Sequence, residues 1–144
     1  MQILVATPTL LPKAAKLAQM LWPHHSAALL EAELQDQLDS GAAVLLAMEN
    51  EQPIGFAQCS LRHDYVEGTS SSPVGYLEGI FVLPEYRRRG IAHKLLDACQ
   101  EWTKLQGCRQ FASDCALDNN NSLRFHLACG FTEANRIICF VKQL

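Results

Sequence analysis

The sequence lacks an excess of basic residues and lacks any apolar run long enough to span a membrane. Its 12 Lys and Arg residues stand against 15 Asp and Glu residues, which gives a formal net charge of -3. Nucleic-acid binding needs a basic surface, so this balance argues against nucleic acid as the main partner, whereas a cationic substrate is compatible with it. No apolar run reaches the roughly 18 residues of a membrane span, and no basic segment precedes the first apolar residues. We therefore expect a cytoplasmic protein with no membrane partner.

The sequence also lacks closely spaced cysteines. None of its six cysteines belongs to a C-x-x-C pair, and most lie within apolar stretches. This pattern favours buried thiols in a reducing compartment over disulfides, with Cys115 as the exception because it borders a polar loop. We expect no disulfide framework and no metal site.

Internal repeats, low-complexity tracts and linkers are absent as well, so the 144 residues suit one domain at positions 1–144. Apolar periodicity and turn residues predict strands at 3–6, 43–48, 54–61, 74–82, 110–113 and 131–142. They predict helices at 10–21, 26–40, 90–105 and 122–129. This order predicts an α/β domain with a mixed sheet that helices cover on both faces.

Two of the expected helices are amphipathic. The helix at 26–40 has a leucine face made of Leu29, Leu30, Leu34 and Leu38. We interpret its opposite, acidic face as solvated surface rather than a binding site: Glu31, Glu33, Asp36 and Asp39. The helix at 90–105 has a stripe that we expect to be buried, formed by Ile91, Leu95, Leu96, Cys99, Trp102 and Leu105.

The segment at 77–98 joins a strand, a basic turn and a helix. The turn reads R-R-R-G-I-A at 87–92. Because the first turn of a helix presents unpaired N–H groups with about half a positive charge, this order predicts a site for a phosphate-bearing cofactor. Gly90 lets the backbone approach an oxyanion closely, and Ala92 keeps the start of the helix slim. The alternative is a basic loop with a glycine before a helix and no ligand.

At this point the sequence resembles the GCN5-related N-acetyltransferase (GNAT) family. The family's acetyl-CoA motif, Q/R-x-x-G-x-G/A, follows a strand of the form L-x-x-[IL]-x-V-x-P, which Leu77, Ile80, Val82 and Pro84 fit nearly in register. The resemblance implies a single α/β domain with a mostly antiparallel sheet flanked by helices, and acetyl-CoA as cosubstrate. It implies that backbone groups of the strand pair with the pantetheine arm: Ile80, Phe81 and Val82. It further implies that N–H groups of the turn and helix hold the pyrophosphate: Arg88, Arg89, Gly90, Ile91, Ala92, His93 and Lys94.

The family's second signature is an Asn in a loop, followed by a helix ending Y-x-x-x-G-F. Here the loop offers asparagines at 119–121, and the helix ends at Gly130 and Phe131 with His126 in the tyrosine position. In relatives this tyrosine is often the acid that protonates the departing CoA thiolate. His126 is therefore a candidate for that role, and a packing histidine is the equal alternative.

A narrower likeness spans nearly the whole chain. The segments W-P-x-H at 22–25, R-H-D-Y-V-x-G at 62–68, S-P-V at 72–74, L-E-G-I-F-V-L-P at 77–84 and F-A-S-D at 111–114 together resemble the aminoglycoside 6'-N-acetyltransferases. The resemblance implies a set of contacts with the aminoglycoside: Trp22, His25, Tyr65, Glu78 and Asp114. It also implies that Asn119 contacts CoA.

The chemistry of these residue types agrees with such a substrate. A polycation calls for carboxylates to hold its ammonium groups and for aromatic faces to make cation-π contacts. Glu78 is polar within an otherwise apolar strand, a placement that is costly unless the group is solvated or paired. We therefore expect Glu78 to be the base that takes a proton from the amine, directly or through water. The structural alternatives are a helix-end contact for Trp22, a surface aromatic for Tyr65 and a helix cap for Asp114.

The end of the chain departs from the pattern of the close relatives. Where they read G-F-x-E-T-E, this chain reads G-F-T-E-A-N at 130–135, so Asn135 replaces an acid that binds substrate. We expect weaker binding of one ammonium group or a shifted drug preference. After Phe131 the chain is also short for the family's terminal hairpin, so we expect a homodimer in which a partner completes the sheet.

These features predict an enzyme that transfers acetyl from acetyl-CoA to the 6'-amine of aminoglycosides by direct attack in a ternary complex. An acetyl-cysteine route is disfavoured, because the sequence marks no base beside a cysteine. One alternative is an acetyltransferase of the same fold that acts on a polyamine or a protein N-terminus. Another is a non-catalytic acyl-CoA sensor, which would have no need for Trp22, Glu78 and Asp114.

Overall fold

The protein folds around a five-stranded sheet whose strands keep their sequence order. The computed structural model describes all 144 residues. The strands are β1 (Gln2–Val5), β2 (Ala43–Glu49), β3 (Gln52–Arg62), β4 (Val74–Val82) and β5 (Phe111–Ser113). Neighbouring strands from β1 to β4 pair antiparallel, and β5 joins β4 in parallel. The predicted mixed, mostly antiparallel sheet is confirmed.

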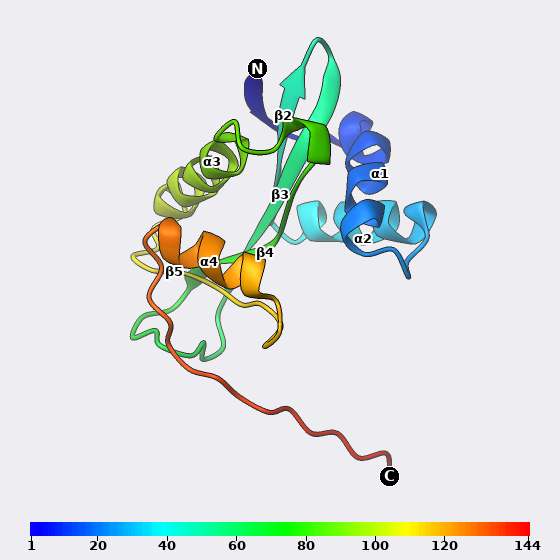
Figure 1. The fold of residues 1–144 in the computed structure, drawn as a ribbon. Coiled ribbons are helices and arrows are strands. Elements are labelled where there is room, and N and C mark those ends of the chain that lie inside the picture. The colour runs from blue at the N-terminus through cyan, green and yellow to red at the C-terminus, as the bar shows by residue number, and fades with distance from the viewer.

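Helices cover both faces of the sheet (Figure 1). α1 (Leu11–Leu21), which follows a 3-10 turn at Pro8–Leu10, and α2 (Ala27–Asp39) lie on one face. α3 (Ile91–Leu105) lies on the other face, after a second 3-10 turn at Pro84–Tyr86. α4 (Asn120–Ala128) follows β5 at the end of the sheet where β4 begins. None of these helices has the length and apolar character needed to cross a lipid bilayer.

The local signals for α2 act as the sequence predicts. Ser26 Oγ accepts a hydrogen bond from the Leu29 N–H at 3.1 Å and caps the helix. Leu30 and Leu34 are buried, whereas Leu29, which we expected on the buried face, is 48% exposed. The difference follows from position, because Leu29 lies in the first turn and the buried face of α2 begins one residue later.

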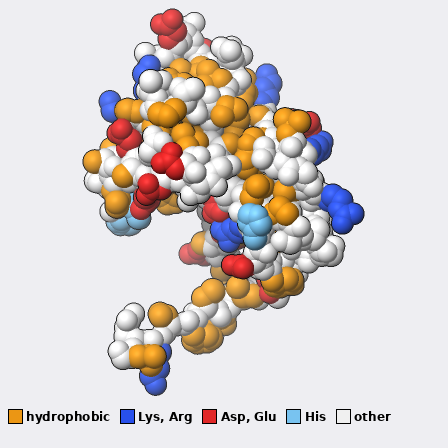
Figure 2. Space-filling view, turned by 180° about the vertical axis from the view of Figure 1, so that it is seen from behind, with side chains coloured by type: hydrophobic (Ala, Val, Ile, Leu, Met, Phe, Trp, Pro, Cys, Tyr) orange, Lys and Arg blue, Asp and Glu red, His pale blue; other side chains and the backbone are white.

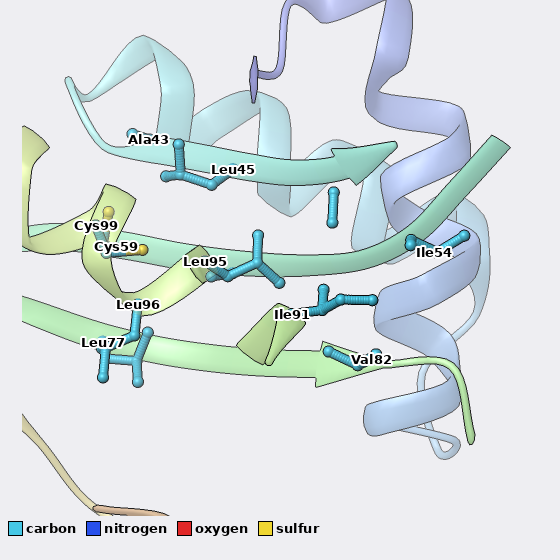
Figure 3. Packing of buried hydrophobic residues seen from close by; sticks show 12 residues of the cluster. Ala43, Leu45, Ile54, Cys59, Leu77, Val82, Ile91, Leu95, Leu96 and Cys99 are labelled. Carbon is cyan, nitrogen blue, oxygen red and sulfur yellow. The ribbon is translucent and has the colours of Figure 1, made fainter. Parts of the chain in front are cut away.

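The α3 face of the sheet is packed by the residues expected from the helical stripe. Figure 3 shows Ile91, Leu95, Leu96 and Cys99 of α3 against side chains of β2, β3 and β4. Trp102 packs against this cluster, but Leu105 is 84% exposed, and Thr103 is buried in the last turn instead. The expectation for Leu105 was wrong because, in the last turn of α3, Thr103 faces the sheet and Leu105 faces solvent.

Thr103 packs so closely on β4 that only glycine fits at position 75. A Cβ at Gly75 would overlap the Thr103 side chain and lie 2.8 Å from Phe111 Cδ2. Overpacking of this kind costs about 1–3 kcal/mol, so we expect Gly75→Ala to lower the free energy of unfolding by that amount in urea titrations. Thr103→Ala, which removes the overlapping atoms, should restore part of the loss in the double variant. Equal stability of Gly75→Ala and wild type would contradict this packing.

The C-terminal segment differs from the prediction. We expected a strand at 131–142, but residues 131–144 form no helix or strand. Residues 131–137 line a cavity beside the loop at 66–69, and the rest of the segment runs away from the body of the molecule (Figure 1). The large apolar side chains from residue 137 onward are 64–115% exposed: Ile137, Ile138, Phe140, Val141 and Leu144. A strand needs a neighbour with which to pair its backbone groups, and this segment pairs with no strand of its own chain.

All six cysteines are free, as expected. Cys59, Cys99 and Cys108 are buried, whereas Cys115 and Cys139 are exposed. Cys59 and Cys99 face each other between β3 and α3 (Figure 3), and the hydrogen bond between their thiols, together with burial, raises the pKa of Cys99. These buried thiols therefore behave as core side chains rather than nucleophiles.

Candidate active site

The middle of β4 has a free edge. β5 pairs with β4 only over Gly75–Leu77, so no strand lies beside residues 78–82 on that side. An extended ligand can hydrogen-bond to such an unpaired strand edge. The edge includes Ile80, Phe81 and Val82, which the resemblance to the GNAT family assigns to the cofactor. Arg87 Nε donates to the Val82 carbonyl at 2.9 Å and ties the following turn to the end of the strand.

The turn after β4 leads into an uncapped helix. Gly90 is the N-cap of α3 with φ of +74°, and no side chain caps the helix. Arg88 also has a positive φ, of 62°. The first bond within the helix runs from the Lys94 N–H to the Gly90 carbonyl at 3.1 Å. The N–H groups of residues 91–93 are therefore open to an anion, whereas that of Lys94 is used inside the helix.

Two of the three arginines in the turn are held by aromatic rings. The Arg87 guanidinium lies 5.4 Å from the centre of the Phe81 ring, and that of Arg89 lies 5.1 Å from the centre of the Tyr86 ring. These contacts fix positive charge beside the open helix terminus, where it favours a phosphate.

Glu78 lies on the α1 and α2 face of β4 and is fully hydrogen-bonded on one oxygen. Ser60 Oγ donates to Glu78 Oε1 at 2.7 Å, and Arg62 donates to the same oxygen through Nε and Nη2. Glu78 Oε2 accepts only one bond, from Arg62 Nη2 at 2.9 Å. Because each carboxylate oxygen has about two acceptor positions, Oε2 keeps one free. The sequence argument that Glu78 must be paired or solvated is thus confirmed, with Arg62 as its partner.

Arg62 continues the network to Asp114. Its guanidinium stacks 3.5 Å from the centre of the Tyr76 ring, and the Tyr76 hydroxyl donates to Asp114 Oδ2. Burial, reinforced by Asp114, raises the pKa of Tyr76, so the phenol remains a donor at neutral pH. The hydrogen bond to Glu78 raises the pKa of Arg62. The network contains two carboxylates and one guanidinium, which leaves it with a net negative charge.

Sequence reasoning gave no role to Ser60, Arg62 or Tyr76. A signal existed, because Gln58, Ser60 and Arg62 place polar side chains at alternate positions of β3, and alternate positions share one face of a strand. What the sequence did not show was the pairing of β3 with β4, in which Ser60 lies opposite Tyr76.

Trp22 and His25 lie with Glu78 in one cavity of about 380 Å³. Trp22 ends α1 and packs edge-on against Phe56 at 6.1 Å between ring centres. Its ring also covers Gly79, where a Cβ would lie 2.7 Å from the indole. Trp22 therefore serves both as a helix-end contact and as a wall of the cavity.

A larger cavity of about 560 Å³ lies between β5, α4, the loop at 66–69 and the start of the C-terminal segment. Asp114, His126 and Asn135 line it, and Asn135 Nδ2 donates to Glu67 at 3.4 Å. The structure therefore places both Asp114 and Asn135 in a different cavity from Glu78. Tyr65 is 75% exposed and lines neither cavity.

His126 is hydrogen-bonded through both ring nitrogens. Nδ1 lies 2.7 Å from the Ser122 carbonyl, and Nε2 lies 2.8 Å from Ser113 Oγ. Because a carbonyl can only accept, Nδ1 carries the proton of the neutral ring, and Nε2 accepts from Ser113. The ring also packs on Phe131 at 5.0 Å between centres. Nearby, Asn119 Oδ1 caps α4 by accepting from the Ser122 N–H at 3.1 Å.

One cysteine does have a base beside it, which the sequence did not reveal. Cys129 Sγ, at the end of α4, lies 3.3 Å from His93 Nε2, in the first turn of α3. Burial, together with the charge of Asp97, raises the pKa of the Cys129 thiol. A nucleophilic cysteine requires the opposite shift, so the contact does not favour an acetyl-cysteine route.

Comparison with known proteins supports this picture. The family model of the acetyltransferase (GNAT) family matches residues 11–131. An aminoglycoside N(6')-acetyltransferase type 1 from Acinetobacter genomosp. 13 is 42% identical over 100% of this chain and 99% of its own length. The apo crystal structure of aminoglycoside 6'-N-acetyltransferase AAC(6')-IG from Acinetobacter haemolyticus is 39% identical, covers 100% of this chain and 99% of that one, and has a TM-score of 0.94.

A third relative was solved with a ligand. AAC(6')-Iy in complex with the bisubstrate analogue CoA-S-monomethyl-acetylneamine is 42% identical, with 99% of this chain and 98% of that chain covered and a TM-score of 0.94. The match of the family model over most of the sequence and the identity over the full length lead to the same conclusion: this chain belongs to the GNAT family of acetyltransferases.

Proposed function

We propose that this protein transfers the acetyl group of acetyl-CoA to the 6'-amine of aminoglycosides, and that residues 1–144 form one N-acetyltransferase domain. The observation that carries the proposal is the double role of β4. The free edge of β4 leads to the uncapped start of α3. The face of β4 toward α1 and α2 presents Glu78 to a cavity walled by Trp22 and His25. Relatives named for this activity match the chain over its full length.

The residues present fit acetyl-CoA. The open N–H groups at 91–93 and the fixed charges of Arg87 and Arg89 suit a pyrophosphate. The free edge at 78–82 suits the amide groups of a pantetheine arm. Acetyl-CoA supplies the acetyl group as a reactive thioester. Arg88 lies in the same turn, and Asn119 at the start of α4 retains a free amide for a further contact.

Glu78 acts as the base in this proposal. The amine is protonated at neutral pH and has to lose a proton before it can attack, and Glu78 Oε2 has the free acceptor position to take that proton, directly or through water. The amine then attacks the thioester carbonyl in the ternary complex without an acyl-enzyme intermediate. The C–N bond forms, the C–S bond breaks, and CoA leaves as a thiolate that takes the second proton of the nitrogen, directly or through water. Trp22 offers a ring face to the cation, and Asp114 offers a second carboxylate. The geometry of His126 favours a packing role, because its proton is held by Ser122.

Arg62 positions Glu78 for this step. Arg62→Gln is expected to lower kcat about tenfold, since a hydrogen bond to a charged group contributes about 1.5–3 kcal/mol and its loss frees the carboxylate to rotate. The KM for the aminoglycoside should not rise, because the cavity becomes more negative. Steady-state kinetics check this prediction. A raised KM with unchanged kcat would contradict it.

A homodimer is the second part of the proposal. Two features of the single chain would fit each other in a pair of chains. The apolar side chains at 137–144 are exposed, and the 560 Å³ cavity beside the short edge strand β5 is open. In a pair of chains, the segment of each could add a strand beside β5 of the other, which would bury both features. We also propose a cytoplasmic location, which the six free cysteines support.

A panel of acceptors tests the proposed function. Thiol release from acetyl-CoA should proceed with a far higher kcat/KM for kanamycin than for spermidine or a peptide N-terminus. A preference for spermidine or the peptide would favour the alternative acetyltransferase. Binding of acetyl-CoA with no thiol release for any amine would favour the acyl-CoA sensor.

A further inference from the structure

The acidic face of α2 is not simply solvated surface. Two of its four carboxylates, Glu33 and Asp36, line the same cavity as Glu78, Trp22 and His25. In Figure 2, acidic side chains gather on the α2 side of the molecule, above a hollow that separates α2 from the β5 and α4 end. Glu31 and Asp39 lie on the same helix but do not line the cavity.

The carboxylates in this cavity lack cationic partners. No Lys or Arg lines it, and neither Glu33 nor Asp36 takes part in an ion pair. Only Glu78 is neutralised, by Arg62. The cavity therefore has excess negative charge.

A buried polar side chain without a partner points to a ligand at the same place. Gln58 is 8% exposed, its side-chain amide makes no hydrogen bond in the structure, and it lines this cavity. On β3 it lies opposite Gly79, the residue covered by the Trp22 ring. The residue is buried, but its amide atoms are open to the cavity, because Thr103 Oγ1 is the one fully buried side-chain polar atom without a partner. The Gln58 side-chain carbonyl can accept from an ammonium group, and its NH₂ can donate to a sugar hydroxyl.

We propose that Glu33, Asp36 and Gln58 form a second acceptor subsite, which binds an ammonium-bearing, hydroxylated ring of the substrate other than the ring that carries the reacting amine. This inference rests on the proposed function for the identity of the substrate. The carboxylates hold the ammonium group, and Gln58 holds a neighbouring polar group of the same ring. The subsite lies between α2 and β3, continuous with Glu78 in one cavity of about 380 Å³.

The test compares a substrate that reaches the subsite with one that is too short. The double variant Glu33→Gln/Asp36→Asn should raise the KM for kanamycin about tenfold, because two exposed charge pairs contribute roughly 0.2–1 kcal/mol each and tenfold corresponds to about 1.4 kcal/mol. The KM for 6-amino-6-deoxyglucose, which has one ring and one amine, should stay unchanged. Gln58→Leu should likewise raise the KM for kanamycin and leave the KM for 6-amino-6-deoxyglucose unchanged.

The control is the matched pair Glu31→Gln/Asp39→Asn, which removes the same charge from the same helix outside the cavity and should leave both KM values unchanged. An equal rise for both substrates, or a kanamycin KM that stays at the wild-type value, would overturn the subsite. If wild type releases no thiol with either substrate, the proposed function fails. Calorimetry of kanamycin binding then tests the subsite by itself, with weaker binding to the double variant as the expected result and equal binding as the contrary one.

Discussion

Glu78→Gln is expected to reduce kcat by about 10²–10⁴-fold, the usual contribution of a general base. The amide keeps the size of the carboxylate and can still accept from Ser60 and Arg62, but it cannot take a proton. Binding of acetyl-CoA should be unchanged, because the cofactor half of the site lies at the free edge of β4 and the start of α3. Single-turnover kinetics and calorimetry with acetyl-CoA measure the two effects separately.

Arg62→Gln serves as the control, because it disturbs the position of Glu78 but leaves the carboxylate in place. Unchanged turnover of Glu78→Gln with kanamycin would remove Glu78 from the mechanism.

Ile138→Asp/Phe140→Asp is expected to convert a dimer to monomers and to abolish most activity. These side chains are 79% and 90% exposed in the single chain and would be buried on exchange, where an unpaired charge costs several kcal/mol. The cavity that Asp114 lines would remain open without the partner segment. Light scattering coupled to size-exclusion chromatography measures the mass, and the thiol assay measures the activity.

The matched control is Lys142→Asp/Gln143→Asp, which adds charge to the same segment without touching its apolar side chains. It should remain dimeric. A wild-type protein that is monomeric and fully active at assay concentration would contradict the proposed exchange.

Elements with strong local signals were predictable from the sequence. The strand at 74–82 and the start of α3 at Gly90 agree with the structure, because apolar runs, Pro84 and Gly90 specify them within a few residues. The segment at 131–142 shows where prediction from local sequence fails. Its apolar alternation is typical of a strand, but pairing depends on a neighbour distant in sequence or in another chain, and in the single chain it is unpaired.

Some residues of the candidate site were also predictable from the sequence, and others were not. The resemblance predicted a shared acceptor site from residues 22, 25, 65, 78 and 114. The structure brings Trp22, His25 and Glu78 to one cavity, whereas Asp114 lines the other cavity and Tyr65 lines neither. The roles of Arg62 and Tyr76 depend on cross-strand pairing, which composition and spacing do not reveal. The acids at 33 and 36 lie on a helix face that has the pattern of solvated surface. Only the fold, which brings residues of α2, β3 and β4 to one cavity, shows that these acids line it.

The most direct test of the central claim compares two acceptors that differ at one position. Thiol release from acetyl-CoA is measured with kanamycin and with an analogue that has a hydroxyl in place of the 6'-amine. The account predicts rapid release with the amine and only background release with the hydroxyl. Equal release with both acceptors would contradict transfer to the 6'-amine, and no release with either would contradict acetyl transfer to aminoglycosides.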